Sequence, residues 1–320
     1  MKAIKVFFGN LIVFIFLALI AESIFGYWFF GPDLGFLNVK INQTRIDSNS
    51  PYYPPETKVV YRRDQYGLRG NYGSPENITI LAVGGSTTND RVANEGDTWA
   101  DVLQQNLQIF GKNEIVANAG IDGHSTVGHI RSFELWFNKI PGLSPRYIVY
   151  YIGVNDRGVE ADNIPQPDSL TSPSLVRRIS HYIKNHSFFM RGFGNFKGFL
   201  AARHIGVAYE YWDFRESEPE FVFATQILEP DRLFLASLDA YRERLKILYM
   251  LASNFGAKPI YVTEPVGLVK KEGGDLYVVK GSRADLIYLQ MLEYNRVLME
   301  FCASVEATPG GSNKLRQVIL

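Results

Sequence analysis

The stretch Ile78–Thr88, ITILAVGGSTT, decides how the rest of the chain is interpreted. Its apolar run, Ile78–Val83, ends in two glycines, and Ser86 follows at once. A short run that is apolar rather than alternating is typical of a parallel strand covered on both faces. Glycines after such a run indicate a tight turn. We therefore expect a buried strand that delivers a serine to a strand-to-helix turn.

Strands and helices alternate after this point. Short apolar runs predict further strands over Glu114–Ala119, Tyr147–Ile152 and Lys258–Thr263. Helical spacing predicts helices over Thr98–Phe110 with Asp97 as its N-cap, over Ser125–Ile140, and over about Asp231–Phe255 and Ser282–Glu306. This alternation predicts an α/β fold with a doubly wound parallel sheet.

Three short motifs follow the first three predicted strands. They are Gly84–Thr88 (GGSTT), Asn118–Gly123 (NAGIDG) and Gly153–Asp156 (GVND). Ligands bind outside the carboxyl ends of the strands in an open parallel sheet, so the three turns should meet at one crevice. A serine hydroxyl can act there as a nucleophile, while a glycine N–H and an asparagine amide stabilise the oxyanion of acyl transfer.

In this order and spacing, the motifs resemble the first three sequence blocks of the SGNH (GDSL-type) hydrolases. Gly85 stands where that family usually has aspartate, and residues 64–70 (DQYGLRG) resemble a stretch found ahead of the first block in exported members. The resemblance implies a flavodoxin-like three-layer sandwich and a serine esterase without a cofactor. It also implies Ser86 as the nucleophile, with Gly123 and Asn155 as oxyanion-hole donors.

The family's catalytic base is a histidine in a C-terminal Asp-x-x-His block, and this chain has none after its last histidine, His204. Glu306 stands where the histidine would be, and Ala303 where the aspartate would be. A carboxylate with an ordinary pKa of about 4.3 is a poor base for a serine hydroxyl. His124 and His129 follow the second motif, where helix-surface or packing roles are the alternative. The base is therefore not identified, and the chain is a divergent or internally shortened relative.

Two simpler interpretations stay open for these motifs. Gly84–Thr88 can be a phosphate-binding turn at a helix start, although it lacks the P-loop lysine and the spacing of a dinucleotide fingerprint. The Asn155-Asp156 pair can simply cap a turn.

The N-terminus predicts export. Lys2 and Lys5 precede an apolar stretch, Val6–Ala21, and aromatic residues follow it. Residues 1–30 are thus a signal anchor or a cleaved signal peptide, and either places the body of the protein on the extracytoplasmic side, periplasmic or cell-surface. We expect a linker at 31–56 without regular structure, and an SGNH hydrolase-like domain at 57–320 with an insertion at about 157–230.

Composition excludes some partners. Lysine plus arginine equals aspartate plus glutamate, 33 each, which argues against nucleic acid as the main partner. No metal-ligand spacing is evident, and the single cysteine, Cys302, is expected to be buried. The expected function is a membrane-anchored esterase or deacylase for an O-acyl ester, such as one on an envelope glycan. The alternatives are a catalytically inactive SGNH-like domain that binds an acylated glycan or a partner protein, and an acyltransferase.

Overall fold

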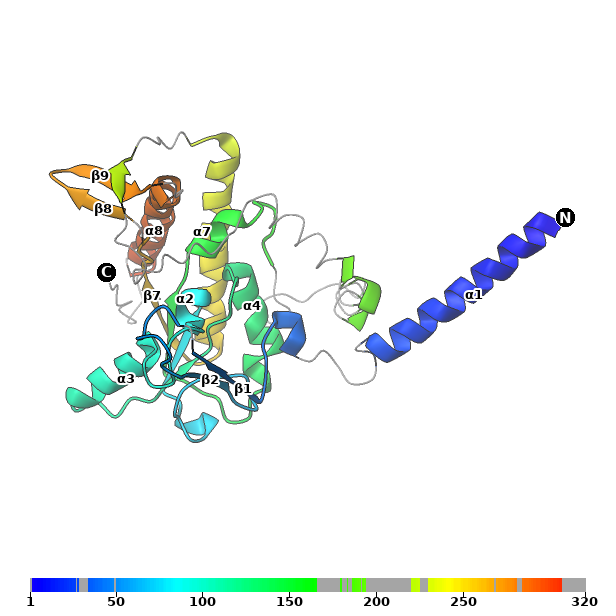
Figure 1. Cartoon of the computed structure of the whole chain (residues 1–320), viewed down its shortest axis with the longest axis horizontal. Coiled ribbons are helices and arrows are strands. Elements are labelled where there is room, and N and C mark those ends of the chain that lie inside the picture. Colours follow the sequence, from blue (N-terminus) through cyan, green and yellow to red (C-terminus); the bar gives the residue numbers. More distant parts are fainter. Residues whose placement is uncertain are drawn as a thin grey trace. The chain divides into compact units, whose positions relative to one another are not determined.

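The chain folds into two compact units, residues 1–36 with 172–208 and residues 37–171 with 209–320 (Figure 1). The computed structural model describes residues 2–26, 28, 34–48, 50–165, 179, 183, 186–190, 192–193, 220–224, 230–267, 269–280 and 284–306. Most of the insertion predicted at about 157–230, including His181 and His204, lies outside the described residues.

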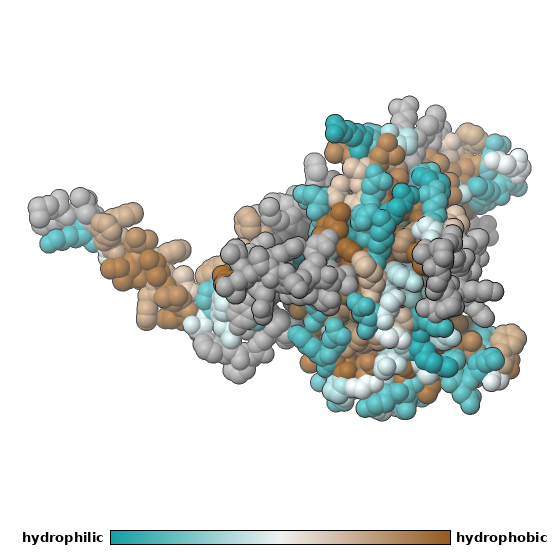
Figure 2. All heavy atoms as spheres, turned by 180° about the vertical axis from the view of Figure 1, so that it is seen from behind, coloured by the Kyte–Doolittle hydropathy of each residue, from teal (hydrophilic) through white to brown (hydrophobic). Residues whose placement is uncertain are grey.

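A long apolar helix, α1 (Lys2–Phe25), dominates the described part of the first unit. Its 24 residues extend about 36 Å, slightly more than the roughly 30 Å of a bilayer's hydrocarbon core. The segment Lys5–Phe25 is apolar enough to cross a membrane, and Figure 2 shows apolar atoms along the helix. A helix of this kind so near the N-terminus fits both a signal sequence and a membrane anchor.

A four-stranded parallel sheet forms the centre of the second unit. Its order is β4-β3-β5-β7, with bounds Ile80–Gly84 (β3), Val116–Asn118 (β4), Tyr147–Tyr151 (β5) and Lys258–Val262 (β7). Ile80 of β3 lies opposite Val116 on one side and Tyr147 on the other. The connection after β3 leads to β4 on one side of the sheet, and the connection after β5 leads to β7 on the other. The carboxyl ends of the adjacent strands β3 and β5 therefore form a topological switch point. The predicted α/β fold is confirmed.

Helices cover both faces of this sheet. On one face, helix α3 (Trp99–Ile109) packs Ala100 against Ala82 and Val149. On the other face, the ring of Tyr150 stacks on Tyr261 at 5.1 Å between centroids. The Tyr150 hydroxyl reaches a carbonyl of α7 (Arg232–Asn254), and the Tyr261 ring contacts α8 (Ala284–Glu306). These packings give the predicted three layers.

The remaining elements border the sheet. Short helices are α2 (Ser86–Asn89), α4 (Thr126–Leu135) and the 3-10 turns η1 (Leu34–Leu37), η2 (Pro75–Asn77), η3 (Phe137–Lys139) and η4 (Val154–Gly158). Strands β1 (Gln43–Asp47) and β2 (Val59–Arg63) pair antiparallel, as do β6 (Phe221–Phe223), β8 (Val269–Glu272) and β9 (Asp275–Val279). Cys302 is buried, as expected.

The structure differs from the sequence analysis in four details. The expectation that residues 31–56 lack regular structure is wrong at β1, whose backbone pairs with β2 and whose side chains alternate in burial. Helix α3 is capped by Thr98 rather than Asp97, because Thr98 and Asp101 form a reciprocal capping box. The predicted helix Ser125–Ile140 ends as an α-helix at Leu135, and the β6-β9-β8 sheet was not predicted.

A buried ion pair joins the third motif to the helices. Asp156 and Arg244 of α7 are both fully buried and lie 3.2 Å apart. Asp156 also accepts the backbone N–H of Thr126 at 3.1 Å, so it caps α4, and Arg244 donates to the Thr126 hydroxyl at 2.7 Å. Three elements therefore depend on one charge pair. Asp156 thus caps a helix, whereas the simpler sequence interpretation had the Asn155-Asp156 pair cap a turn.

We expect Arg244→Ala to destabilise the protein by roughly 3–5 kcal/mol, because it leaves the buried Asp156 carboxylate without its cation. The matched control is Arg242→Ala on the same helix. Arg242 is partly exposed and pairs with Glu300 at 2.7 Å, so its loss should cost about 0–1 kcal/mol. Urea unfolding of the full chain in detergent, followed by circular dichroism, compares the two. Equal losses would contradict a dominant role for the buried pair.

Candidate active site

The three sequence motifs lie at the carboxyl ends of three neighbouring strands. Ser86 begins α2 directly after β3, with Gly85 as the N-cap. Gly123 has a φ of 74°, and Gly153, which follows β5, has a φ of 145°. Glycine suits both positions because other residues rarely adopt such backbone angles. The turns are thus shaped by their glycines.

Asn155 connects the first and second motifs. Its side-chain amide donates to the carbonyl of His124, the residue after Gly123, at 2.9 Å. The same amide lies against Gly85, where an added Cβ would come within 2.5 Å of Asn155 Nδ2. Gly85 therefore leaves the space that the Asn155 amide fills. A larger residue before Ser86, such as aspartate, would require the Asn155 amide to move.

The serine turn is also held by the second motif. Asn118 donates from its amide to the Thr88 carbonyl at 2.6 Å and accepts the Gly120 N–H at 2.9 Å. Gly120 packs so closely on the backbone of Thr88 and Asn89 that a Cβ there would overlap it. Ser86 itself is half-buried, and within the described part of the chain its hydroxyl has no hydrogen-bond partner.

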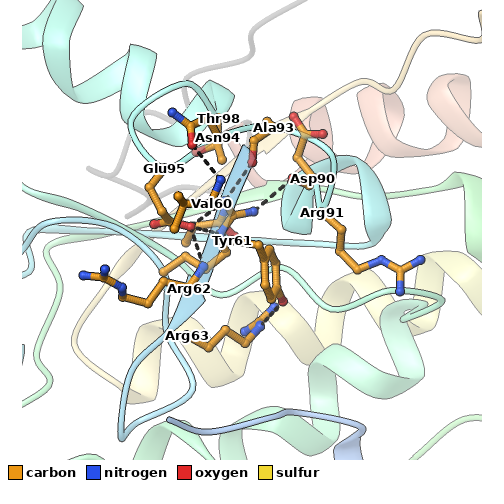
Figure 3. A network of polar contacts seen from close by, with 12 residues as sticks. Val60, Tyr61, Arg62, Arg63, Asp90, Arg91, Ala93, Asn94, Glu95 and Thr98 are labelled. Atoms are coloured by element: carbon orange, nitrogen blue, oxygen red, sulfur yellow. Dashed lines mark hydrogen bonds and ion pairs between the residues drawn. The ribbon is translucent and has the colours of Figure 1, made fainter. Parts of the chain in front are cut away.

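Two buried arginines from the stretch ahead of the first motif hold the C-terminal end of α2. Arg69 donates to the carbonyls of Asn89 and Asp90 and pairs with Glu95 at 2.7 Å. Arg63 donates to the Asn89 side-chain oxygen at 2.7 Å and to the Tyr61 hydroxyl at 2.6 Å. Figure 3 shows Tyr61 and Arg63 pointing toward each other. Arg69, which lies in the stretch 64–70, thus supports the loop that follows α2.

Backbone N–H groups of the strand β2 complete this network by donating to side chains of the loop after α2. Val60 donates its N–H to the Asn94 side chain at 2.8 Å, and Arg62 donates its N–H to Glu95 at 2.9 Å (Figure 3). The loop after α2 is therefore fixed to β2 on one side and to Arg69 on the other. A turn that is held at so many points can keep a serine at a constant position.

Glu264 is a buried carboxyl group at the same edge of the sheet, and sequence reasoning missed it. It follows β7 and is 2% exposed. One oxygen accepts the Thr87 hydroxyl at 3.0 Å and the other accepts the Val154 N–H at 2.9 Å. Asn295 of α8 holds its backbone through two further hydrogen bonds. Glu264 thus joins the neighbour of Ser86 to the neighbour of Asn155.

Burial gives Glu264 an unusual acidity. It raises the pKa of the carboxyl group from 4.5 to about 7, although the hydrogen bonds from Val154 and Thr87 oppose the rise. Asp156 adds to the rise and Arg157 counteracts it. Tyr151 faces the same carboxyl, and burial, with the Glu264 charge, raises the pKa of this phenol to about 12. Glu264 is therefore a carboxyl group at this edge that titrates near neutral pH, as does Asp90 after α2, whose pKa burial raises to about 6.

The two histidines near the second motif are buried, and burial makes both rings weaker bases than usual. The His124 ring contacts the Leu37 carbonyl through Nε2 at 2.8 Å, and burial lowers its pKa to about 4. His129 is fully buried, which lowers its pKa well below the usual value. The two rings lie 5.7 Å apart. Both are neutral packing residues at physiological pH, in line with the simpler interpretation of the sequence.

No metal site is evident in the described ranges, where no three His, Cys, Asp or Glu side chains are grouped to hold an ion. A surface cavity of about 460 Å³ lies beside β1 and β2 rather than at the three motifs. Its lining residues are Asn42, Thr44, Arg62, Arg63, Asp64, Gln65, Tyr66 and Gly73. Because Ser86, Gly123 and Asn155 do not line it, we do not assign it to the candidate active site.

Comparison with known proteins identifies neighbours in fold only. No protein-family model and no curated protein matches the sequence. Among solved structures, an acetyl xylan esterase, AlAXEase, is 14% identical, with 76% of this chain and 77% of that chain covered and a TM-score of 0.37. A GDSL-like lipase from Bacteroides thetaiotaomicron is 13% identical, with 75% and 67% covered and a TM-score of 0.33.

A third neighbour is AlinE4, an SGNH-hydrolase family esterase. It is 13% identical, with 73% of this chain and 81% of that chain covered and a TM-score of 0.33. These three neighbours are thus an acetyl xylan esterase, a GDSL-like lipase and an SGNH-hydrolase family esterase, all at low sequence identity.

Proposed function

We propose that the protein is a serine ester hydrolase that acts on an O-acyl ester, with Ser86 as the nucleophile. The observation that carries this proposal is the Asn155 amide, which lies against Gly85 and donates to the His124 carbonyl. This contact gathers a serine turn, a glycine turn and an asparagine at one edge of a parallel sheet. Acyl transfer needs such a combination of nucleophile and oxyanion donors.

In the proposed reaction, the Ser86 hydroxyl passes its proton to a general base while its oxygen attacks the ester carbonyl, and the base returns the proton to the alcohol as the ester C–O bond breaks. Water then attacks the acyl-enzyme in the same way, which releases the acid and restores the Ser86 hydroxyl. The backbone N–H groups of Ser86 and Gly123 and the second N–H of the Asn155 amide stabilise the negative oxygen of each tetrahedral intermediate. Each donor contributes about 3 kcal/mol to the transition state.

Glu264 acts in this proposal as a positioning residue. It contacts Thr87 and Val154, the chain neighbours of Ser86 and Asn155, rather than the reacting atoms. Ionised Glu264 accepts both hydrogen bonds and holds the nucleophile turn and the oxyanion turn at a fixed spacing. The proton on one oxygen of the neutral acid removes an acceptor and loosens this link.

The N-terminus supports the location and substrate class that we propose. With α1 as a signal anchor, the catalytic unit faces the extracytoplasmic side, where acylated envelope glycans are available O-acyl esters. A short acyl group such as acetyl on a glycan is the substrate class we propose.

A second candidate function is that of a catalytically inactive domain, which binds an acylated glycan or a partner protein. The observation that favours it is the placement of His124 and His129: burial lowers the pKa of both rings, His124 Nε2 contacts the Leu37 carbonyl, and within the described residues no hydrogen bond joins either ring to Ser86. Reactivity of the serine separates the two functions.

We expect a fluorophosphonate probe to label the full chain, and Ser86→Ala to abolish labelling, because the probe forms its bond only with an activated serine. Ser125→Ala is the matched control. Ser125 is the N-cap of α4 next to the second motif, but its side chain makes no capping hydrogen bond, so labelling should persist. In-gel fluorescence of detergent-solubilised protein measures the outcome. Absence of labelling in well-folded wild-type protein supports the inactive binding domain.

Asn155→Ala should slow probe labelling by about 10²–10³-fold, because one oxyanion donor is lost. Asn106→Ala on the exposed surface of α3 provides the control, since its amide reaches only the Val102 carbonyl within its own helix. Labelling rates are compared at matched concentrations. An unchanged rate in Asn155→Ala would exclude it from the oxyanion hole.

Labelling of Ser86 should accelerate as pH rises through about 7, where Glu264 ionises. Glu264→Gln should flatten this pH profile, whereas Glu300→Gln on the exposed face of α8 should keep it. Stability should change in the opposite direction. Because the folded pKa is raised, the carboxyl's contribution is fully present below about 4.5 and is lost as pH rises through about 7. A pH profile identical in wild type and Glu264→Gln would refute the positioning role.

A further inference from the structure

Exposed apolar side chains gather in the first compact unit outside α1. Ile179, Ile183, Phe189, Met190 and Phe193 are all exposed, and Phe193 reaches 60% exposure. Ile179 and Ile183 are both in helical backbone. Large exposed apolar groups in one segment indicate a surface that contacts another apolar phase.

The same segment is bonded to the end of α1. Glu22, in the last turn of that helix, accepts the backbone N–H groups of Phe188 at 2.9 Å and Phe189 at 3.2 Å, and also the Ser187 hydroxyl. The ring of Phe25 lies 5.4 Å from the ring of Phe188. The segment is thus fixed where the apolar helix ends.

The charge of this segment differs from that of the whole chain. The segment, residues 179–193, contains Lys184 and Arg191 and no aspartate or glutamate, and the flanking residues 172–178 and 194–208 add four lysines and arginines, at 177, 178, 197 and 203, also without an acidic residue. The full chain has zero formal net charge. A segment that combines basic and large apolar residues is typical of one that lies in the interface of an anionic bilayer, where basic groups meet lipid phosphates and apolar groups enter the acyl boundary.

We propose that the segment around residues 179–193 is a second membrane contact, which lies in the interface of an anionic bilayer and is held there by Glu22 at the end of α1. The inference is independent of the esterase proposal but rests on α1 spanning the same bilayer. Glu22 supports it, because a carboxylate this close to the end of an apolar span is favoured at the boundary with water. Trp28 donates to Glu22 at 2.9 Å and adds an aromatic residue of the kind enriched there.

Site-specific fluorescence tests the contact in the full chain, reconstituted in vesicles with or without anionic phosphatidylglycerol. An environment-sensitive dye is attached at Phe193→Cys, and the unsubstituted chain, whose one cysteine is buried, gives the blank. Phe110→Cys is the matched control, since Phe110 is an aromatic residue with 76% exposure on the other unit. Phe14→Cys reports whether α1 is inserted.

We expect a blue shift and quenching by shallow spin-labelled lipid at position 193, both larger with phosphatidylglycerol, and neither at position 110. Deep spin labels should quench position 14. Water-like emission at 193 in both vesicle types overturns the proposal, as does absence of quenching at 14.

Glu22→Ala tests the attachment. It should reduce quenching at position 193 and leave quenching at position 14 unchanged, because α1 stays inserted while the segment loses its carboxylate partner. Glu22→Gln retains one acceptor oxygen and should restore part of the signal. Unchanged quenching at 193 in Glu22→Ala overturns the role of Glu22.

Discussion

The geometry of the site depends on the tertiary fixation of α2, a helix of only four residues. A helix this short has no stability of its own, because nucleation is unfavourable and few internal hydrogen bonds form. Each residue after Ser86 is therefore bonded to a different part of the fold. Thr87 bonds to Glu264 after β7, the Thr88 carbonyl accepts from Asn118 of β4, and the Asn89 side chain accepts from Arg63 of β2. The serine is positioned by the whole edge of the sheet.

This fixation works because glycines let backbones approach. At Gly84, an added Cβ would lie 2.5 Å from the Tyr151 carbonyl, so the end of β3 can sit directly beside β5. At Gly85, the missing side chain leaves room for the Asn155 amide. Gly-Gly before the serine is thus a packing requirement of this particular site.

The sequence predicted what local patterns encode. The apolar runs at Ile78–Val83 and Tyr147–Ile152 identified buried strands, and their carboxyl ends located the first and third motifs. Glu264 was missed because Thr-Glu-Pro after a strand has no distinctive pattern, and only burial in the folded protein raises its pKa. One usable signal was its position after a fourth parallel strand. The hairpin of β8 and β9 also carried a signal, the two glycines between the strands, since such pairs favour tight turns.

Buried charge gives the two sides of the site different electrostatic characters. Arg63 is 3% exposed and interacts electrostatically with the adjacent Asp64, and its guanidinium donates to Asn89 and to the Gly120 carbonyl of the second motif. A buried cation on this side favours negative charge on an oxygen near Gly123 and adds to the burial that lowers the His124 pKa. It also opposes a base that becomes positively charged. Glu264 has the reverse effect on the β7 side. The charge of Arg63 thus favours negative groups on the side of the second motif, and the Glu264 carboxylate disfavours them on the β7 side.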